Sequence, residues 1–559
     1  MKDIVIKSIV KATKLNKEQV EKLLEVPPNP ELGDYAFPCF TLSKKFKKSP
    51  VEIAQDLIKK IPLEKNFEKI EDKGPYLNFF LNRKELAKSI LTEVQKKKDK
   101  FGSSKSKSKI LIEFSQPNTH KAFHVGHIRG TSLGESLARI LEFSGNKVIR
   151  ANYSGDTGMH IAKWIWCYKK YHSKEKITDN ESWIASIYVD AVKKLTKNEK
   201  FQEEVDEINR KIESKEDPEI NELWKKTREL SINSWERIYS ELNTKFDVQF
   251  FESEMEKEGK NISQQLLKDK IAEKSEGAVI VNLEKYNLGI WVLLRNDGTV
   301  LYSAKDLALA KIKVEKYNSD RYITILGDEQ KMHSQQILKT MELMKFKERN
   351  KFIYPTFGMV RLPTGKMSSR TGDNILYSDF MKEVTEFAKA GIKSRDSKIK
   401  NKDLEERALK ISVAAIKYAM LKQSVNKNMI FDKKEALNFE GDTGPYLLYT
   451  YARARSILRK AKFNPKKKYN LLNLSDKEKN LIVQMGKFSE IVKQAYSHLA
   501  PNLVANYAYE LAQSFNEFYH STQVIGDDRE QFLLVLVSSF SQVLKNALNL
   551  LGIEVLEKM

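Results

Sequence analysis

The segment from residue 110 to residue 152 constrains the fold most strongly, because two apolar runs flank a helical pattern there. Ile110-Leu111-Ile112-Glu113-Phe114 is short and apolar enough for a buried strand. A polar loop and a helical pattern follow, Gly145 stands where a helix stop is expected, and residues 147–152 form a second predicted strand. Consecutive strands joined by a helix pair in parallel, so the sequence predicts an α/β domain built on a parallel sheet.

The rest of the chain divides around this domain, since 559 residues are too many for one core. Residues 96–109 are rich in lysine and serine and are predicted to be a linker after a small α+β domain at 1–95. The α/β domain is expected at 110–385, interrupted by a charged, mostly helical insertion at about 164–276. Apolar residues recur three and four apart through 386–559, which predicts an all-α helix bundle.

Shorter patterns refine these domains. Alternating or continuous apolar runs predict further strands, at residues 76–81, 278–281 and 322–326. Helical spacing in the last third is clearest at residues 404–421, 446–458 and 532–551.

The charge balance favours a polyanionic partner. Lysine and arginine outnumber aspartate and glutamate by 97 to 75, a net charge of +22, which attracts nucleic acid through steering and counterion release. For any single lysine, a solvated surface position is an equally good explanation. Charge alone therefore names a class of partner and no site.

Other features of composition concern the compartment. Cys39 and Cys167 have neither metal-ligand nor disulfide-framework spacing, which is typical of a reducing compartment and predicts no structural metal. The N-terminus lacks a leader pattern, and the apolar run near residues 532–537 is too short to span a bilayer. We expect a cytoplasmic protein with no membrane association.

His124-Val125-Gly126-His127 marks a candidate nucleotide site. It falls between a predicted buried strand and the following helix, at the sheet edge where parallel sheets bind ligands. The unpaired N–H groups of a helix N-terminus suit phosphate oxygens, and Gly126 lets the backbone approach a ligand closely. Both histidines would project from the first helical turn and could donate to phosphate. The alternative is that they only cap the helix.

A second basic motif is Lys366-Met367-Ser368-Ser369-Arg370, flanked by Gly365 and Gly372 and expected to form a loop. Nucleotidyl transfer expels pyrophosphate, so cations that close over the leaving group stabilise the transition state. A solvated basic turn would account for the motif if it stood alone. Its pairing with the histidine motif favours phosphoryl chemistry.

Together the two motifs resemble the HIGH and KMSKS motifs of class I aminoacyl-tRNA synthetases. The resemblance implies a Rossmann-type catalytic domain with an inserted helical subdomain, preceded by the small α+β domain and followed by the helix bundle. The second lysine of KMSKS is replaced by Ser369, which leaves Lys121 and Arg370 as candidates for the missing charge. ATP, with Mg²⁺ but without a dedicated protein site for the metal, is expected at His124, Gly126, His127, Lys366, Met367, Ser368 and Ser369. The implied catalytic residues are His124, His127, Lys121, Lys366 and Arg370.

Three polar segments near predicted strand ends suggest the amino acid. A guanidinium is a planar fork of five donors that pairs best with carboxylates, which Glu113 and Asp306 would supply with the Tyr302 hydroxyl. Asn118 and Gln330 remain for the α-amino and carboxylate groups. The segments, including the Tyr-x-x-x-Asp spacing, resemble the arginyl-tRNA synthetase substrate motifs. The arginine contacts this implies are Glu113, Gln116, Pro117, Asn118, His127, Tyr302, Asp306 and Gln330.

The flanking domains carry the candidate RNA contacts. Residues 442–455 interleave aromatic and basic side chains, a mixture suited to stacking on bases, although Leu447, Leu448 and Tyr451 are expected to face the core. Residues 442–455 and the C-terminal end resemble the anticodon-binding domain of arginyl enzymes, and residues 30–36 and 74–79 resemble their N-terminal domain. The candidate tRNA contacts are Tyr76, Asn78, Tyr446, Tyr449, Arg453, Arg455 and Arg459; a buried strand equally explains the first two.

The resemblance covers nearly the whole chain and implies an arginine-tRNA ligase. L-Arginine would attack ATP to give arginyl-adenylate, and tRNA(Arg) would then take the arginyl group on its terminal ribose. Activation is expected to require bound tRNA, and the enzyme to be a monomer. Two alternatives stay open: a nucleotidyltransferase of another substrate class, and a tRNA-binding relative without activity.

Overall fold

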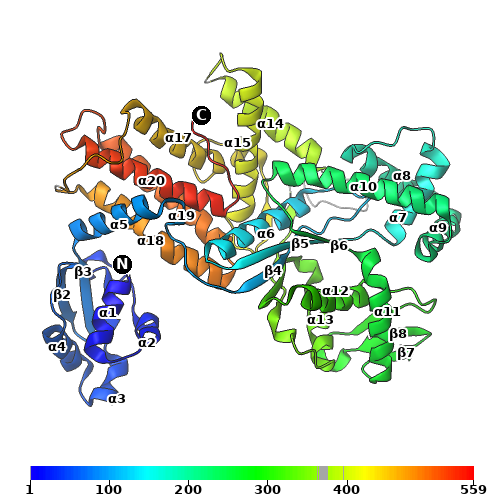
Figure 1. Ribbon diagram of the computed structural model, residues 1–559, viewed down its shortest axis with the longest axis horizontal. Helices are drawn as coiled ribbons and strands as arrows, with labels where there is room; N and C mark the ends of the chain where they lie inside the picture. Colours follow the sequence, from blue (N-terminus) through cyan, green and yellow to red (C-terminus); the bar gives the residue numbers. More distant parts are fainter. Residues whose placement is uncertain (1, 362, 364–375, 395, 472) are drawn as a thin grey trace. The chain divides into compact units, whose positions relative to one another are not determined.

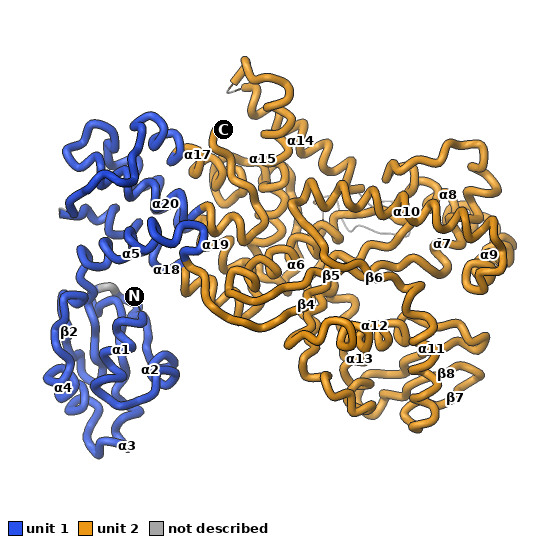
Figure 2. The backbone as a smooth tube through the Cα atoms, in the orientation of Figure 1, with its two compact units in different colours: residues 1–101, 454–488, 510–544 blue, residues 102–453, 489–509, 545–559 orange. Residues whose placement is uncertain are grey.

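The computed structural model describes residues 2–361, 363, 376–394, 396–471 and 473–559. The chain forms two compact units, each assembled from separated stretches of sequence (Figure 2). The first comprises Met1–Phe101, Ala454–Phe488 and Glu510–Leu544. The second comprises Gly102–Arg453, Ser489–Tyr509 and Lys545–Met559.

The first unit begins with the expected α+β domain. Its antiparallel sheet has the order β1-β3-β2, with β1 at Tyr35–Pro38, β2 at Phe67–Lys73 and β3 at Tyr76–Leu81. Its helices are α1 (Lys2–Thr13), α2 (Lys17–Leu23), α3 (Ser43–Phe46), α4 (Pro50–Lys60) and α5 (Arg83–Lys97). Asn16 and Ser49 cap α2 and α4 through capping boxes, which explains where these helices begin. Because α5 runs to Lys97, the predicted linker begins too early.

Four long helices make up the C-terminal part of the chain: α17 (Gly444–Lys460), α18 (Asp476–His498), α19 (Pro501–Ser521) and α20 (Glu530–Leu550). By length and composition α20 could cross a membrane, which counting contiguous apolar residues did not reveal. Within its most apolar window 78% of the residues are buried in the protein. A core helix meets the same criteria, so this feature is weak support for a membrane span.

The second unit is built on a five-stranded sheet with the order β12-β10-β4-β5-β6, in which every pairing is parallel. Its strands β4, β5 and β6 are labelled in Figure 1. The strands are β4 (Lys109–Glu113), β5 (Lys147–Ser154), β6 (Val248–Phe251), β10 (Arg321–Thr324) and β12 (Phe352–Ile353). Helix α6 (Val125–Phe143) connects β4 to β5, as predicted. The strand order reverses between β4 and β10, so a crevice is expected at their carboxyl ends.

The predicted insertion at 164–276 is too long. Its helices are α7 (Met159–Cys167), α8 (Glu181–Lys197), α9 (Gln202–Ser214) and α10 (Pro218–Glu241), and a separate core around Trp164 and Trp224 holds α7, α8 and α9 together. However, β6 then returns to the central sheet beside β5. Four residues between charged segments carry too little periodicity to be recognised as a strand, which explains the error.

A small subdomain follows β6. Helices α11 (Glu252–Lys268) and α12 (Tyr302–Tyr317) share a hydrophobic core with an antiparallel sheet of β7 (Glu273–Ser275), β8 (Ala278–Asn282) and β9 (Ile290–Leu294). The predicted strand at 322–326 is divided, because β10 ends at Thr324 and Leu326 begins β11 (Leu326–Gly327), which pairs with β13 (Thr356–Phe357).

Helices dominate the remainder of the second unit. They are α13 (Lys331–Leu343), α14 (Tyr377–Lys393), α15 (Asn401–Leu421) and α16 (Lys433–Ala436). Within the predicted all-helical region, β15 (Met429–Ile430) pairs in parallel with β14 (Val360–Arg361). Among the described residues from 386 onward, this two-residue strand is the one departure from the predicted all-helical structure.

Candidate active site

A cavity of about 890 Å³ opens where the strand order predicts a crevice. The loop after β4, the first turns of α6 and α12 and the segment after β11 all contribute to its wall. Of the residues proposed from the sequence, it brings together Glu113, Gln116, Asn118, His124, Gly126, His127, Tyr302, Asp306 and Gln330. Pro117 and Lys121 are not among the described residues that line it. Lys366, Met367, Ser368, Ser369 and Arg370 lie outside the described residues.

His124 and His127 form the N-terminal cap of α6. The His124 Nδ1 atom accepts the Gly126 N–H at 3.1 Å, and the His127 Nδ1 atom accepts the His124 N–H at 3.1 Å. The two rings stack with centroids 3.9 Å apart. Because each Nδ1 accepts, the neutral rings carry their protons on Nε2. Capping and donation to a ligand are therefore compatible, since they use different nitrogens of the same ring.

Burial keeps these histidines neutral. Burial and the nearby Lys121 ammonium lower the pKa of His124 to about 4. Burial, His124 and Lys121 lower the pKa of His127 well below its ordinary value. A Cβ atom on Gly126 would lie 2.9 Å from the His124 ring, so this glycine leaves room for the imidazole. Neutral N–H donors are what the site offers to an anionic ligand.

The loop between β4 and α6 is strained and tightly held. Ser115, Gln116 and His120 all have positive φ, a conformation that non-glycine residues rarely adopt and that often accompanies function. The Gln116 N–H donates to the Asn152 side chain at 3.0 Å, and the His120 N–H donates to the Ser231 hydroxyl at 3.1 Å. These bonds compensate the strain and fix the loop beside the cavity.

Asn118 reaches the cavity because its neighbour is a glycine. A Cβ atom on Gly155 would lie 2.3 Å from the Asn118 Oδ1 atom, so any other residue there would displace the amide. The loop that carries Asn118 is tied to the same segment, since the Thr119 N–H donates to the Gly155 carbonyl at 2.9 Å.

Glu113 stands at the end of β4, and it is paired. Its Oε2 atom lies 2.5 Å from the Lys313 ammonium on α12, and its Oε1 atom accepts the Gln116 amide at 2.9 Å. Both members of the pair are buried, with 3% of the Glu113 side chain and 5% of the Lys313 side chain exposed. The carboxylate that the sequence assigned wholly to arginine thus already neutralises a buried lysine.

The structure corrects the local setting of Tyr302 and Asp306. Both lie in the first turns of helix α12 rather than at the end of a strand, and the four-residue spacing directs them to one helix face. The Asp306 carboxylate lies 2.6 Å from the His333 Nε2 atom, and the Tyr302 ring packs edge-on against the His333 ring at 4.8 Å. Sequence reasoning missed His333, because a lone histidine inside a helix carries no local motif.

Other lining residues were also missed. Tyr153 and His160 line the cavity, and the Tyr153 hydroxyl and the His160 Nε2 atom are buried without a partner among the described residues. Buried polar atoms are normally satisfied, so both are available to a ligand. Tyr153 lies next to the carboxyl end of strand β5, where parallel sheets bind ligands. That position is the signal in the sequence that could have indicated it.

Two contacts tie the histidine motif to neighbouring elements. Glu181 on α8 accepts the Phe123 N–H at 3.1 Å and the Ser378 N–H at 3.2 Å, and burial raises its pKa to about 7. Arg129 on α6 is fully buried, and its guanidinium donates to four backbone carbonyls, including Gly358 at 2.6 Å and Lys427 at 2.9 Å. These contacts join α6 to the segments on both sides of residues 364–375.

Lys121 lies close to the histidines, although it does not line the cavity. Burial and the Lys163 charge lower its pKa, and its ammonium stands 5.4 Å from the centre of the Tyr188 ring on α8. Its charge is also one of the causes that lower the pKa of His124 and of His127. The structure therefore places this lysine within electrostatic reach of the motif.

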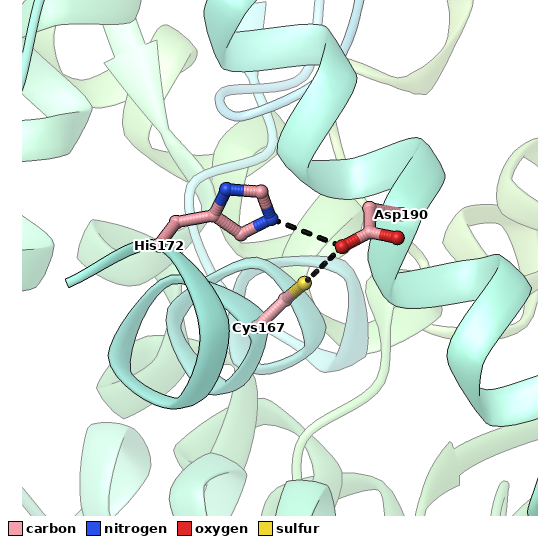
Figure 3. A group of neighbouring side chains, drawn as sticks. All are labelled: Cys167, His172 and Asp190. Carbon is pink, nitrogen blue, oxygen red and sulfur yellow. Dashed lines mark hydrogen bonds and ion pairs between the residues drawn. The ribbon is translucent and has the colours of Figure 1, made fainter. Parts of the chain in front are cut away.

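One group of side chains among the described residues has the spacing of a metal site: Cys167, His172 and Asp190, in the helical insertion (Figure 3). The Asp190 Oδ2 atom lies 3.0 Å from the His172 Nε2 atom, 3.5 Å from the Cys167 sulfur and 3.6 Å from the Lys194 ammonium. Burial raises the pKa of the Cys167 thiol to about 12, and the Asp190 carboxylate is the neighbour that contributes most to this rise. One oxygen thus already serves three partners, and the contacts describe a self-satisfied cluster.

Three of the carboxylates that line the cavity have a basic partner. Glu113 contacts Lys313, Asp306 contacts His333, and Glu252 lies 3.5 Å from the Lys305 ammonium. Such paired oxygens do not form the open set of carboxylates that a hard cation prefers.

The candidate RNA contacts differ in accessibility. Asn78 has only 2% of its surface exposed, so the predicted contact from its side chain is wrong: the residue lies inside the sheet on β3. Tyr76 is half-buried, with its ring edge-on to Phe40 at 5.7 Å. Leu447, Leu448 and Tyr451 are buried, as predicted.

Helix α17 keeps the other candidates at or near its surface. Tyr449 is 37% exposed, and the Arg453 guanidinium lies 4.8 Å from its ring centre. Tyr446 is half-buried against Tyr509, with ring centres 5.7 Å apart. Arg455 is half-buried and Arg459 is exposed. Tyr449 with Arg453 is a cation–π pair of the kind that can stack on a base.

Three protein families match consecutive parts of the chain. Residues 88–433 match the family described as tRNA synthetases class I (R), catalytic domain. Residues 1–81 match the arginyl tRNA synthetase N terminal domain, and residues 447–559 match the DALR anticodon binding domain. The three matches together cover nearly the whole chain.

The chain is also similar over its whole length to individual arginine-tRNA ligases. The chain is 35% identical over 565 residues to an arginine--tRNA ligase of Clostridium acetobutylicum and 36% identical over 573 residues to one of Clostridium perfringens, covering 100% of both chains in each case. Among solved structures it resembles the arginyl-tRNA synthetase of Thermus thermophilus, with a TM-score of 0.82, 25% identity and 100% of both chains covered. The arginyl-tRNA synthetase of Plasmodium falciparum matches with a TM-score of 0.79, 25% identity and 99% coverage of both chains.

Proposed function

The chain belongs to the arginyl-tRNA synthetase family, the class I enzymes that ligate arginine to tRNA(Arg), and we propose which of its residues carry out each part of that reaction. The observation that carries the assignment is the cavity that the histidine motif and the arginine-motif residues line together. The reaction needs no covalent enzyme intermediate, because the arginine carboxylate itself attacks the α-phosphate of ATP.

ATP binds at the N-terminus of α6. The Nε2–H groups of His124 and His127 donate to the triphosphate, and the helix N-terminus adds a favourable field. These donors are neutral and held by the cap, so they need little rearrangement as charge develops on the phosphates. Gly126 leaves room for the nucleotide, and Lys366, Met367, Ser368 and Ser369 contact it from the second motif. A Mg²⁺ ion, when bound with ATP, would add positive charge at the phosphates.

Arginine binds in the same cavity, beside the first turns of α12. Asp306 and Tyr302 on α12 receive the guanidinium, with Glu113 as a second acceptor that is shared with Lys313. Asn118 and Gln330 take the α-amino and carboxylate groups, and His127 and Gln116 lie between the two substrates. Pro117 acts through the loop conformation, because it does not line the described cavity.

Lys121 or Arg370 supplies the charge that Ser369 lacks. Lys121 is supported by its charge, which acts on both His124 and His127. A lysine at this place stabilises the extra negative charge of the transition state through the histidines rather than by direct contact.

The RNA is held by the flanking domains. The N-terminal α+β domain holds one part of tRNA(Arg), with Tyr76 as a contact, and the helical domain at residues 386–559 holds the anticodon region. Tyr449 and Arg453 stack on a base, and Tyr446, Arg455 and Arg459 contact the backbone. The enzyme acts as a cytoplasmic monomer, and the formation of arginyl-adenylate requires bound tRNA.

One assay tests the assignment against its alternatives. Aminoacylation is measured with arginine, lysine and glutamine, and pyrophosphate exchange is measured with and without tRNA(Arg). The proposal expects charging with arginine alone and exchange that rises when tRNA is added. Exchange with another acid substrate would favour a different nucleotidyltransferase, and tRNA binding without either activity would favour an inactive relative.

A further inference from the structure

A chain of three side chains runs from the wall of the cavity into the core beneath it. Asp306 lies on α12, His333 on α13 and Trp291 on β9. The His333 Nε2 atom is 2.6 Å from the Asp306 Oδ2 atom, and the Trp291 Nε1 atom is 3.2 Å from the His333 Nδ1 atom. The exposed fractions of the side chains fall from 23% at Asp306 to 14% at His333, and Trp291 is 3% exposed.

The direction of these hydrogen bonds fixes the protonation of the imidazole. An indole N–H can only donate, so the His333 Nδ1 atom must accept and cannot carry a proton. The single proton of a neutral ring then sits on Nε2, from which it is donated to the Asp306 carboxylate. Trp291 thereby selects both the tautomer and the neutral form of His333.

The neutral form matters because of charge. A protonated imidazole would cancel the negative charge of Asp306, and the pair would no longer attract a cation. The neutral ring orients the carboxylate by a hydrogen bond and leaves its charge for the ligand. It also occupies Oδ2, so Oδ1 is the oxygen left for a guanidinium arm.

His333 supports a second arginine candidate as well. The Tyr302 ring packs edge-on against the His333 ring with centroids 4.8 Å apart, and Tyr302 is 57% exposed. One imidazole therefore fixes the carboxylate through a hydrogen bond and the phenol through ring contact. Both residues that face the guanidinium from α12 depend on it.

We propose that His333 is a positioning residue for arginine: held as the neutral Nε2–H tautomer by Trp291, it orients Asp306 and Tyr302 toward the guanidinium. The proposal rests on the proposed arginine site and adds the two residues that set its geometry and charge. Neither His333 nor Trp291 contacts the reacting atoms.

The first test is a steady-state comparison of variants. His333→Leu removes the donor and should raise the KM for arginine about tenfold, as expected for a lost hydrogen bond to a charged group, while kcat and the KM for ATP change less than about twofold. His333→Gln keeps a donor to Asp306 and should restore the KM for arginine to within about threefold of wild type. His498→Leu, which removes an exposed histidine elsewhere in the unit, is the matched control.

The second test reads the tautomer directly in the wild-type enzyme. Nitrogen-15 NMR of labelled histidine, assigned with the His333→Gln variant, should show Nδ1 without a proton and Nε2 with one. Trp291→Phe keeps an aromatic ring but loses the donor, and should give a mixture of protonation forms together with a raised KM for arginine. This measurement does not depend on whether His333→Leu folds.

The outcomes separate this inference from the arginine site itself. If Asp306→Asn raises the KM for arginine but His333→Leu does not, the site stands and the role of His333 is refuted. If neither variant changes it, the arginine assignment fails. A protonated Nδ1 in the wild-type spectrum, or an equal loss of kcat and of ATP binding in His333→Leu, would also overturn the proposal.

Discussion

The buried pair of Glu113 and Lys313 allows its structural role to be separated from substrate binding. Glu113→Gln leaves the Lys313 ammonium buried with no carboxylate, since the two atoms lie 2.5 Å apart and both side chains are almost fully enclosed. Breaking one partner of such a pair costs about 3–5 kcal/mol of unfolding free energy. We expect this loss in Glu113→Gln, and an equally serious one in Lys313→Met.

The double variant Glu113→Gln with Lys313→Met removes both charges and should recover most of that stability, because replacing a whole buried pair is often neutral. Unfolding in urea, followed by tryptophan fluorescence, measures the stability of all four proteins. The KM for arginine is measured in parallel. It should stay raised in both proteins that lack the Glu113 carboxylate, whatever their stability.

Two results would refute this reasoning. A loss below about 1 kcal/mol in Glu113→Gln would mean that the lysine is not buried against the carboxylate as described. A KM for arginine that returns to the wild-type value in the double variant would mean that Glu113 only holds Lys313 and does not bind the substrate.

Four further predictions concern the same unit. Asp306→Asn should raise the KM for arginine by tenfold or more, roughly, because a charged acceptor is lost, and an unchanged KM in steady-state aminoacylation would contradict the assignment. Lys121→Ala should slow pyrophosphate exchange with tRNA present, and an unchanged rate would shift the missing charge to Arg370. Arg129→Met removes the buried donor to four backbone carbonyls and should cost about 3 kcal/mol or more in urea unfolding, and a normal stability would argue against these bonds. Burial lowers the pKa of His120 to about 3 and that of His124 to about 4, so below pH 6.5 the unfolded chain binds protons that the folded chain cannot. The unfolding free energy should therefore decrease as the pH is lowered from 6.5 to 4, at most by about 1.4 kcal/mol per pH unit for each histidine. Urea unfolding at a series of pH values measures this decrease, and a flat profile would show that the rings are exposed.

The sequence was sufficient where a pattern repeats over many residues. Helices α6, α15 and α20 and the strands β4 and β5 follow from apolar periodicity and from Gly145, and the parallel sheet follows from their order. Short elements escaped for the same reason. Strand β6 has four residues and β15 has two, so their pairing in the folded chain, rather than local preference, makes them strands.

Motif chemistry predicted which polar residues meet at the cavity but not how they are paired. The sequence suggested Glu113 and Asp306 as free carboxylates, whereas their partners Lys313 and His333 lie on helices α12 and α13 without any motif. Such pairings depend on which helix faces pack together, which local spacing does not encode. Asn78 failed for a related reason, because a polar residue on a strand can be enclosed by its sheet.

Burial of both cysteines has a practical consequence for studying this enzyme in motion. Cys39 and Cys167 are fully enclosed, and burial raises the pKa of the first thiol to about 11 and of the second to about 12. At neutral pH only about one Cys39 thiol in ten thousand is then a thiolate, the form that reacts with alkylating dyes. Cysteines introduced on the surface can therefore be labelled selectively in the otherwise natural chain, so that fluorescence can follow each compact unit as tRNA binds.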